Sequence, residues 1–299
     1  MKRNPYPIFA GLLFAGTALA GTPIHQTRAV NADARIDVSN IKGSVTVSAW
    51  DKPEVAISGS LGDGAKGLQV DGGADHLTIK VQPPDKQGWF SWGADTRMGD
   101  TLLELKVPKA AEMKIEVVSA DVSLGGVAGR SLRVDSVSGK LRLDSGAKDV
   151  EIGSVSGNID LTGSAERAHV ETVSGSIRAR GLGGQIKFDT VSGDVDADNG
   201  SYREINAGTV SGDISLRGKP ADGARIEVET MSGDVHLYLP ADASARLRAS
   251  SFSGSIRSDF GSVKEPEHGP GSSLDATSGS GDGQVKIQTF SGDIEIRRQ

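Results

Sequence analysis

A short phrase that recurs eight times limits what this chain can fold into more than any other feature. Each copy reads Ser/Thr, then Val/Met/Phe, Ser, Gly, a variable residue and an aliphatic residue. The glycines of the eight copies are Gly139, Gly157, Gly175, Gly193, Gly212, Gly233, Gly254 and Gly292. Their spacings are 18, 18, 18, 19, 21, 21 and 38 residues. A fixed period near twenty residues predicts stacked structural units.

Apolar residues keep a fixed place around each glycine. With the glycine as position zero, they occur at −7, −5, −2, +2 and +4. The copy around Gly139 has Leu132, Val134, Val137, Leu141 and Leu143. Steps of two within each half are the strand period, so all five positions are expected to face inward. The odd step from −5 to −2 predicts a bend there, and a glycine suits the tight corner that follows.

The same frame fits two segments that lack the full phrase, around Gly43 and Ala120. The sequence therefore predicts an all-β chain, folded as a single parallel β-helix (solenoid) of about ten short rungs with a period of 18–21 residues. An antiparallel sandwich of short strands is the alternative, because it also shows alternation and regular turns. A sandwich gives no reason for the constant spacing of the phrase.

The ends of the chain differ from the repeats. Residues 1–20 have a basic start, an apolar centre and the small-residue sequence Ala18-Leu19-Ala20, which is typical of a secretory signal peptide. An uncleaved anchor helix is the alternative. Residues 21–34 are expected to be a flexible linker. Residues 35–110 form an N-terminal β region, and the regular repeats occupy 111–299 with a flexible Gly/Ser/Pro/Glu-rich insertion at 258–283.

Composition argues against several functional classes. The chain has 33 basic and 39 acidic residues, scattered along the sequence, which argues against a nucleic-acid partner. It has no Cys, and after residue 20 no apolar run reaches the length of a transmembrane helix. No motif for a nucleophile, a catalytic metal or a cofactor occurs. We therefore expect an exported protein that is not an enzyme, carries no cofactor and has no membrane span after signal cleavage.

The loop at 83–100 is the one stretch unlike its surroundings. It places Trp89, Phe90 and Trp92 in a polar segment that contains glycine. Such aromatic side chains can stack on sugars or anchor in a partner or in lipid headgroups, so we treat them as candidate ligand-binding residues. Alternatively, they fold back over the open end of the solenoid and protect its edge. The sequence leaves both interpretations open.

Aspartate recurs at position +1, directly after the glycine. Asp194, Asp213 and Asp234 would lie one above another in a parallel stack, as a weak candidate for a shared cation. Solvated turn residues are the simpler interpretation, and no metal site is predicted. Ser at −1 and Ser/Thr at −3 are expected to hydrogen-bond along the stack.

The repeats resemble the DUF4097 family of β-strand repeat proteins, whose members are often labelled adhesins. The resemblance rests on the eight phrases together with LLELKVPKAAEMKIEVVSADVSL at 102–124, and it covers about residues 35–299. It implies an exported β-helical domain, located in the periplasm or at the cell surface, with a role in surface attachment or envelope-stress sensing. It supplies no catalytic residue.

We therefore expect a non-enzymatic binding module of the cell envelope or surface. Its partner would be an envelope component, a polysaccharide or a protein. The alternative is a structural or sensory scaffold in envelope-stress signalling, which self-associates end to end or binds a protein partner. Arg297 and Arg298, in the last repeat, would blunt the end of the stack and oppose polymerisation.

Overall fold

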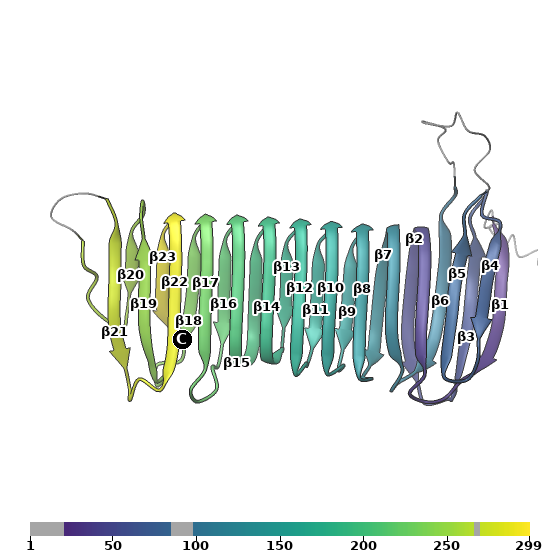
Figure 1. Ribbon diagram of the computed structural model, residues 1–299, viewed down its shortest axis with the longest axis horizontal. Coiled ribbons are helices and arrows are strands. Elements are labelled where there is room, and N and C mark those ends of the chain that lie inside the picture. Colours follow the sequence, from purple (N-terminus) through teal and green to yellow (C-terminus); the bar gives the residue numbers. More distant parts are fainter. Residues whose placement is uncertain (1–20, 85–97, 266–269) are drawn as a thin grey trace, which may run out of the picture.

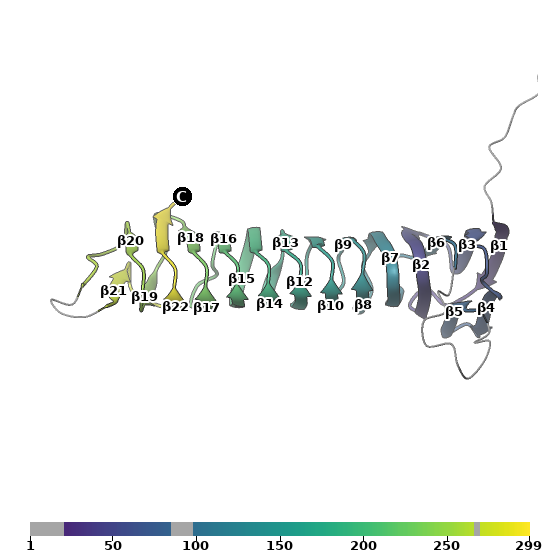
Figure 2. The same cartoon turned by 90° about the horizontal axis from the view of Figure 1, so that it is seen from above.

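The computed structural model describes residues 21–84, 98–265 and 270–299. They form a straight stack of strands in two layers, seen from two directions in Figures 1 and 2. The described residues contain strands and turns but no helix, and hence none that could cross a membrane. The predicted all-β solenoid is confirmed.

Each regular rung consists of two short strands that meet at the corner glycine of the phrase. In the rung of Gly139, β8 (Ser131–Ser138) lies in one layer and β9 (Leu141–Ser145) in the other. The following rungs repeat this plan with β10 (Asp149–Ser156), β11 (Ile159–Gly163), β12 (Arg167–Ser174), β13 (Ile177–Arg180), β14 (Gly183–Ser192), β15 (Val195–Ser211), β16 (Ile214–Gly218), β17 (Arg225–Ser232) and β18 (Val235–Leu239). β15 is long because it completes one rung and begins the next.

Neighbouring rungs pair in parallel and in register. Val150 of β10 lies between Leu132 of β8 and Ala168 of β12, so equivalent positions of successive copies stack directly on one another. This register turns each position of the phrase into a row that runs along the stack. Adjacent members of a row are about 4.8 Å apart, the usual spacing of paired strands.

The core confirms four of the five predicted inward positions. At −7, −5, +2 and +4 the side chains are buried, as for Leu132, Val134 and Leu141. Position −2 was assigned wrongly: Val137 is 49% exposed, whereas Ser136 at −3 is 6% exposed. The strand alternation continues without a break from −7 to −3, so −2 faces solvent. The bend comes later, at the corner between −3 and +2, where the step of five positions is odd and breaks the alternation.

The N-terminal end is built from longer strands and antiparallel pairs. β2 (Arg35–Trp50) pairs on one side with β7 (Glu112–Val127) and on the other with β5 (His76–Gln82) and β6 (Thr101–Pro108). Beyond these, β3 (Glu54–Leu61) lies between β6 and β1 (Thr22–Ala29), and β4 (Gly67–Gly72) pairs with β5, so β1 and β4 are the outermost strands.

Residues 21–34, predicted to be a flexible linker, contain β1. All eight residues of β1 pair with β3, although Ile24 is the only one of them that is buried. Main-chain pairing holds this strand in place with few apolar contacts, which is why hydrophobicity did not reveal it.

At the other end, the order of the rungs departs from the order of the sequence. β22 (Gly283–Ser291) and β23 (Ile294–Arg298) form the last rung in sequence, but β22 pairs with both β17 and β19 (Ala245–Ser251). Likewise β23 pairs with both β18 and β20 (Ile256–Ser258). The C-terminal rung is therefore inserted between its two predecessors, as Figure 1 shows. Arg297 and Arg298 do not end the stack, contrary to the prediction.

The insertion at 258–283 is not simply flexible, because it holds β21 (Ser272–Ser278). This strand runs antiparallel to β19 and ends one layer of the stack. A tight turn then leads around the end of β19 into β22. Gly279 and Gly281 have φ angles of 59° and 75°, a backbone region that disfavours residues with a side chain. The two glycines thereby permit the reversal.

Candidate functional site

A continuous row of exposed apolar side chains runs along one edge of the stack. Ten large hydrophobic side chains of the described residues are exposed, and nine of them occupy position −2. In stack order this outer row consists of Val118, Val137, Val155, Val173, Val191, Val210, Met231, Phe290 and Phe252. Isolated exposed valines are ordinary, but a contiguous apolar surface marks an interaction site.

The C-terminal part of this row forms the floor of an open groove of about 1210 Å³. We call it the aromatic groove and define it by Val210, Met231, Phe290 and Phe252, with a wall made by Lys264, Glu265 and residues 270–273. The rings of Phe252 and Phe290 stack with 4.9 Å between their centroids and an angle of 12° between their planes. Large ligand sites are typically apolar clefts of this kind with a few polar groups at the rim.

We call the six valines from Val118 to Val210 the valine row; Val210, at the boundary, also lines the aromatic groove. A smaller trough of about 620 Å³ lies over the middle of the valine row. Acidic side chains at position −4 flank this trough, namely Glu116, Asp135, Glu171 and Asp189. Gly153 occupies the same position in one rung and leaves the trough open there.

Beneath the outer row lies a row of buried hydroxyl groups at position −3. Ser251 donates to the carbonyl of Gly292 at 2.9 Å, and Ser272 of β21, which pairs with Ser251 and extends the row, donates to that of Gly254 at 3.1 Å. Five other hydroxyls of this row have no hydrogen-bond partner among the described residues: Ser154, Thr172, Thr190, Thr230 and Thr289. The predicted hydrogen bonding along the stack is therefore confirmed at some rungs only.

The aspartates at +1 do stack, and they are engaged by the backbone. The Asp194 carboxylate accepts the N–H of Asp213 at 3.1 Å, and that of Asp213 accepts the N–H of Asp234 at 2.8 Å. The ladder continues through Asp293 to the N–H of Ser255. Each carboxylate thus satisfies a backbone donor of the next rung at the corner. No group of three metal-ligating side chains occurs in the described parts of the chain.

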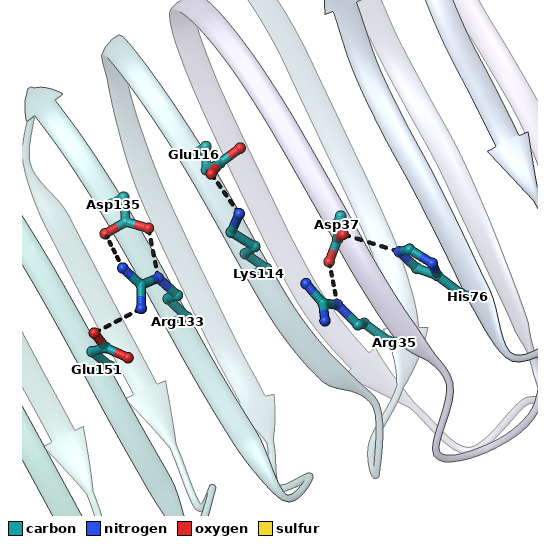
Figure 3. A network of polar contacts seen from close by, with 8 residues as sticks. All are labelled: Arg35, Asp37, His76, Lys114, Glu116, Arg133, Asp135 and Glu151. Atoms are coloured by element: carbon teal, nitrogen blue, oxygen red, sulfur yellow. Dashed lines mark hydrogen bonds and ion pairs between the residues drawn. The ribbon is translucent and has the colours of Figure 1, made fainter.

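The outward side chains of the strand that precedes each corner glycine form ion pairs. Figure 3 shows a group of them near the N-terminal end. Lys114 contacts Glu116 at 2.6 Å, and Arg133 contacts Asp135 at 2.8 Å. Burial alone would raise the pKa of Asp37, but hydrogen bonds from Arg35 and His76 outweigh it and hold that pKa below its usual range. These ion pairs offset part of the negative charge at −4, and the apolar row beside them remains exposed.

The predicted candidates Trp89, Phe90 and Trp92 lie outside the described residues, so they stay a prediction. Sequence reasoning missed the outer row because position −2 was assigned to the core. Two signals pointed the other way: the strand alternation carries −7 and −5 on to −3, and every copy has Ser or Thr at −3.

A family model described as Toastrack DUF4097 matches residues 33–297. The chain belongs to this family. No curated protein matches it. Among solved structures it is similar to a "putative adhesin" from Parabacteroides merdae ATCC 43184, with 8% identity, a TM-score of 0.52, and coverage of 94% of this chain and 97% of that one. At this identity the likeness shows the fold alone.

Two further solved structures, both from Parabacteroides distasonis ATCC 8503, are similar at lower scores. A "putative adhesin" has 12% identity and a TM-score of 0.47, covering 94% of this chain and 98% of that one. A "Putative lipid binding protein" has 14% identity and a TM-score of 0.44, covering 93% and 97%.

Proposed function

We propose that this Toastrack chain is an exported, non-enzymatic binding module of the cell envelope or cell surface, and that the aromatic groove is its ligand site. The observation that carries the proposal is the outer row, which exposes an apolar side chain at the same position of nine successive rungs. The similarity of the fold to a solved "putative adhesin" is consistent with it. Export rests on the signal-like residues 1–20.

The ligand end of the row is the C-terminal end, because the side chains become larger there. Valine gives way to Met231, Phe290 and Phe252, which are all at least half exposed. Flat stacked rings offer contact area at a low cost in side-chain entropy, and such residues dominate binding energies at interfaces. The wall at 264–265 and 270–273 adds a second side, so a ligand is held in a groove and not on a flat surface.

The test is co-sedimentation of the purified chain with cell-wall polysaccharide and, separately, with vesicles of envelope lipids. The test variant is Phe252→Ala/Phe290→Ala. A matched control, Val118→Ala/Val137→Ala, changes two residues of the same row at the far end. A third variant, Trp89→Ala/Trp92→Ala, tests the predicted aromatic loop.

Pelleting that the phenylalanine variant loses and the control keeps would support the groove as the site, and the ligand arm that pellets would give the ligand class. Loss in the tryptophan variant alone would place the contact at 83–100 instead. If the native chain stays in the supernatant in every arm, the proposed binding function fails. Mass spectrometry of the exported chain tests cleavage after Ala20 independently.

A further inference from the structure

The valine row has a property that the fold itself does not require. On the same strands, the outward positions −6 and −4 carry no valine at all. They hold Lys114, Glu116, Arg133, Asp135, Glu151, Gly153, His169, Glu171, Lys187, Asp189, Asn206 and Gly208. A general preference of strands for valine would act on all three outward positions. Its restriction to −2 indicates that this row is covered by something apolar.

The row is straight and evenly spaced. The residues on either side of each valine pair in register, as Thr172 with Thr190 and Ser174 with Ser192 on either side of Val173 and Val191. Figures 1 and 2 both show the stack without a bend over these rungs. Six valines at about 4.8 Å intervals extend over roughly 24 Å.

This spacing selects among possible partners. A helix laid along the row repeats every 5.4 Å, so its turns slip by about 0.6 Å per rung and are about half a spacing out of phase at the end of the row. An extended strand repeats its side chains on one face every 6.6 Å or so. A second copy of this chain presents the same row at the same spacing and stays in phase along its whole length.

We therefore infer that two copies of this chain associate side by side through their valine rows, with the long axes of the two stacks parallel. The arrangement follows from charge. A half-turn about an axis parallel to the stack brings each valine against its own equivalent and points the two acidic −4 rows to opposite flanks. A half-turn about the strand direction would instead place the acidic row of one copy on that of the other.

The opposite flank of the row suits this contact. It is formed by the small serines at −1, such as Ser156 and Ser174, which are exposed. In the rungs of Val137, Val155 and Val173 the residue after the glycine is Lys140, Asn158 or Ser176, none of which is acidic, whereas the other three rungs of the row carry Asp121, Asp194 and Asp213 there. The −4 row of one copy thus meets basic or uncharged groups of the other in three of the six rungs, and an acid faces an acid only where Glu116 lies opposite Asp121 and Asp189 opposite Asp194.

The half-exposed valines supply a few hundred Å² of apolar surface per copy. Stable complexes bury about 800 Å² per partner. We therefore expect a reversible association, strongly dependent on concentration, which display on a surface would promote. It is distinct from the end-to-end association considered from the sequence, and it uses residues outside the Met231–Phe290–Phe252 part of the aromatic groove.

The absence of cysteine from the natural sequence allows a direct test. Three single variants of the full chain, Val137→Cys, Val173→Cys and Val210→Cys, are treated with a short bis-maleimide at about 100 µM protein. Thr162→Cys, exposed on the other layer, is the matched control. We expect covalent dimers from all three row variants and not from the control.

Two results would overturn the inference. If none of the row variants forms a dimer beyond the control, the rows do not meet. If Val173→Cys forms a dimer while Val137→Cys and Val210→Cys do not, the copies cross or run antiparallel. Sedimentation equilibrium gives a second readout, in which Val173→Asp should weaken association at least tenfold. Val173→Thr, nearly the same shape, should also weaken it, which keeps the test valid if the aspartate variant folds poorly.

Discussion

The rings of Phe252 and Phe290 stack on one another at 4.9 Å although 38 residues separate them in the sequence. They meet because β22 lies directly beside β19, so the −2 positions of these two rungs are neighbours. The two rings are 52% and 57% exposed. A pair that remains this exposed contributes little to the core and is available to a ligand.

This difference between −2 and −5 predicts a large contrast in stability. Phe290→Ala removes a half-exposed ring and should lower the free energy of unfolding by about 0.5–1.5 kcal/mol, mostly through the lost ring contact. Ile287→Ala, three residues earlier and fully buried, should cost about 2–5 kcal/mol because it leaves a cavity. Urea unfolding followed by circular dichroism compares the two. An equal loss in both variants would mean that Phe290 belongs to the core.

The aspartate ladder predicts a loss of stability in acid. The backbone N–H of Ser255 and its hydroxyl hydrogen-bond to the Asp293 carboxylate and lower its pKa from the usual 3.8. A carboxyl whose pKa is lower in the folded state stabilises that state above its unfolded pKa, and this contribution is lost as the pH falls through the folded pKa. The urea midpoint should therefore fall below about pH 4. Asp293→Asn, which keeps an amide oxygen as acceptor, should show a smaller decrease, and an identical pH profile would contradict the assignment.

Tyr202 predicts the opposite dependence at high pH. Its ring is buried between Gly200 and Gly218, and burial raises the pKa of its hydroxyl to about 12. Because the unfolded tyrosine ionises near pH 10, folding stability is complete below that pH and declines as the pH rises from about 10 to about 12. Ultraviolet titration should show the same number of tyrosines ionising near pH 10 in the native chain and in Tyr202→Phe, because Tyr202 ionises only at a higher pH.

A glycine variant provides the control for this titration. A Cβ on Gly200 would lie 2.0 Å from the Tyr202 ring, so Gly200→Ala must displace the ring. The displaced tyrosine should then titrate near pH 10. Retention of the high pKa in Gly200→Ala would show that the ring is not held between these glycines.

The sequence predicted most of the stack and missed the features that involve backbone pairing. The spacing of the phrase located the corners, and four of five core positions were correct. Position −2 was wrong because valine is apolar in either environment, so hydrophobicity alone could not decide its side. The decisive information was the parity of the strand, which places Ser136 inward and Val137 outward.

The ends of the molecule were harder to predict for a related reason. β1 and β21 contain mostly polar residues and are held by hydrogen bonds to β3 and β19. Such pairing leaves a weak hydrophobic pattern. The rung order at the C-terminal end could not be read from the repeats either, because β17 and β19 both have the register that β22 needs.

That shared register leads to the last prediction, which concerns removal of residues 283–299. Their loss takes away β22 and β23. β17 and β19 then both lose β22, the strand that lies between them and pairs with each. If β19 can move onto β17, the register is already matched, since Ile226 and Leu247 both pair with Val285. The connection at 240–244, however, is built to step over a rung.

We expect the truncated chain to keep the rungs through β16 and to lose protection in 245–278, because a gap in the stack exposes backbone groups of both neighbouring strands. Hydrogen exchange with mass spectrometry measures this directly, with amides of β8–β13 as the internal reference. Full protection of β19 in the truncated chain would instead show that β19 pairs directly with β17. The stack would then be complete without the C-terminal rung.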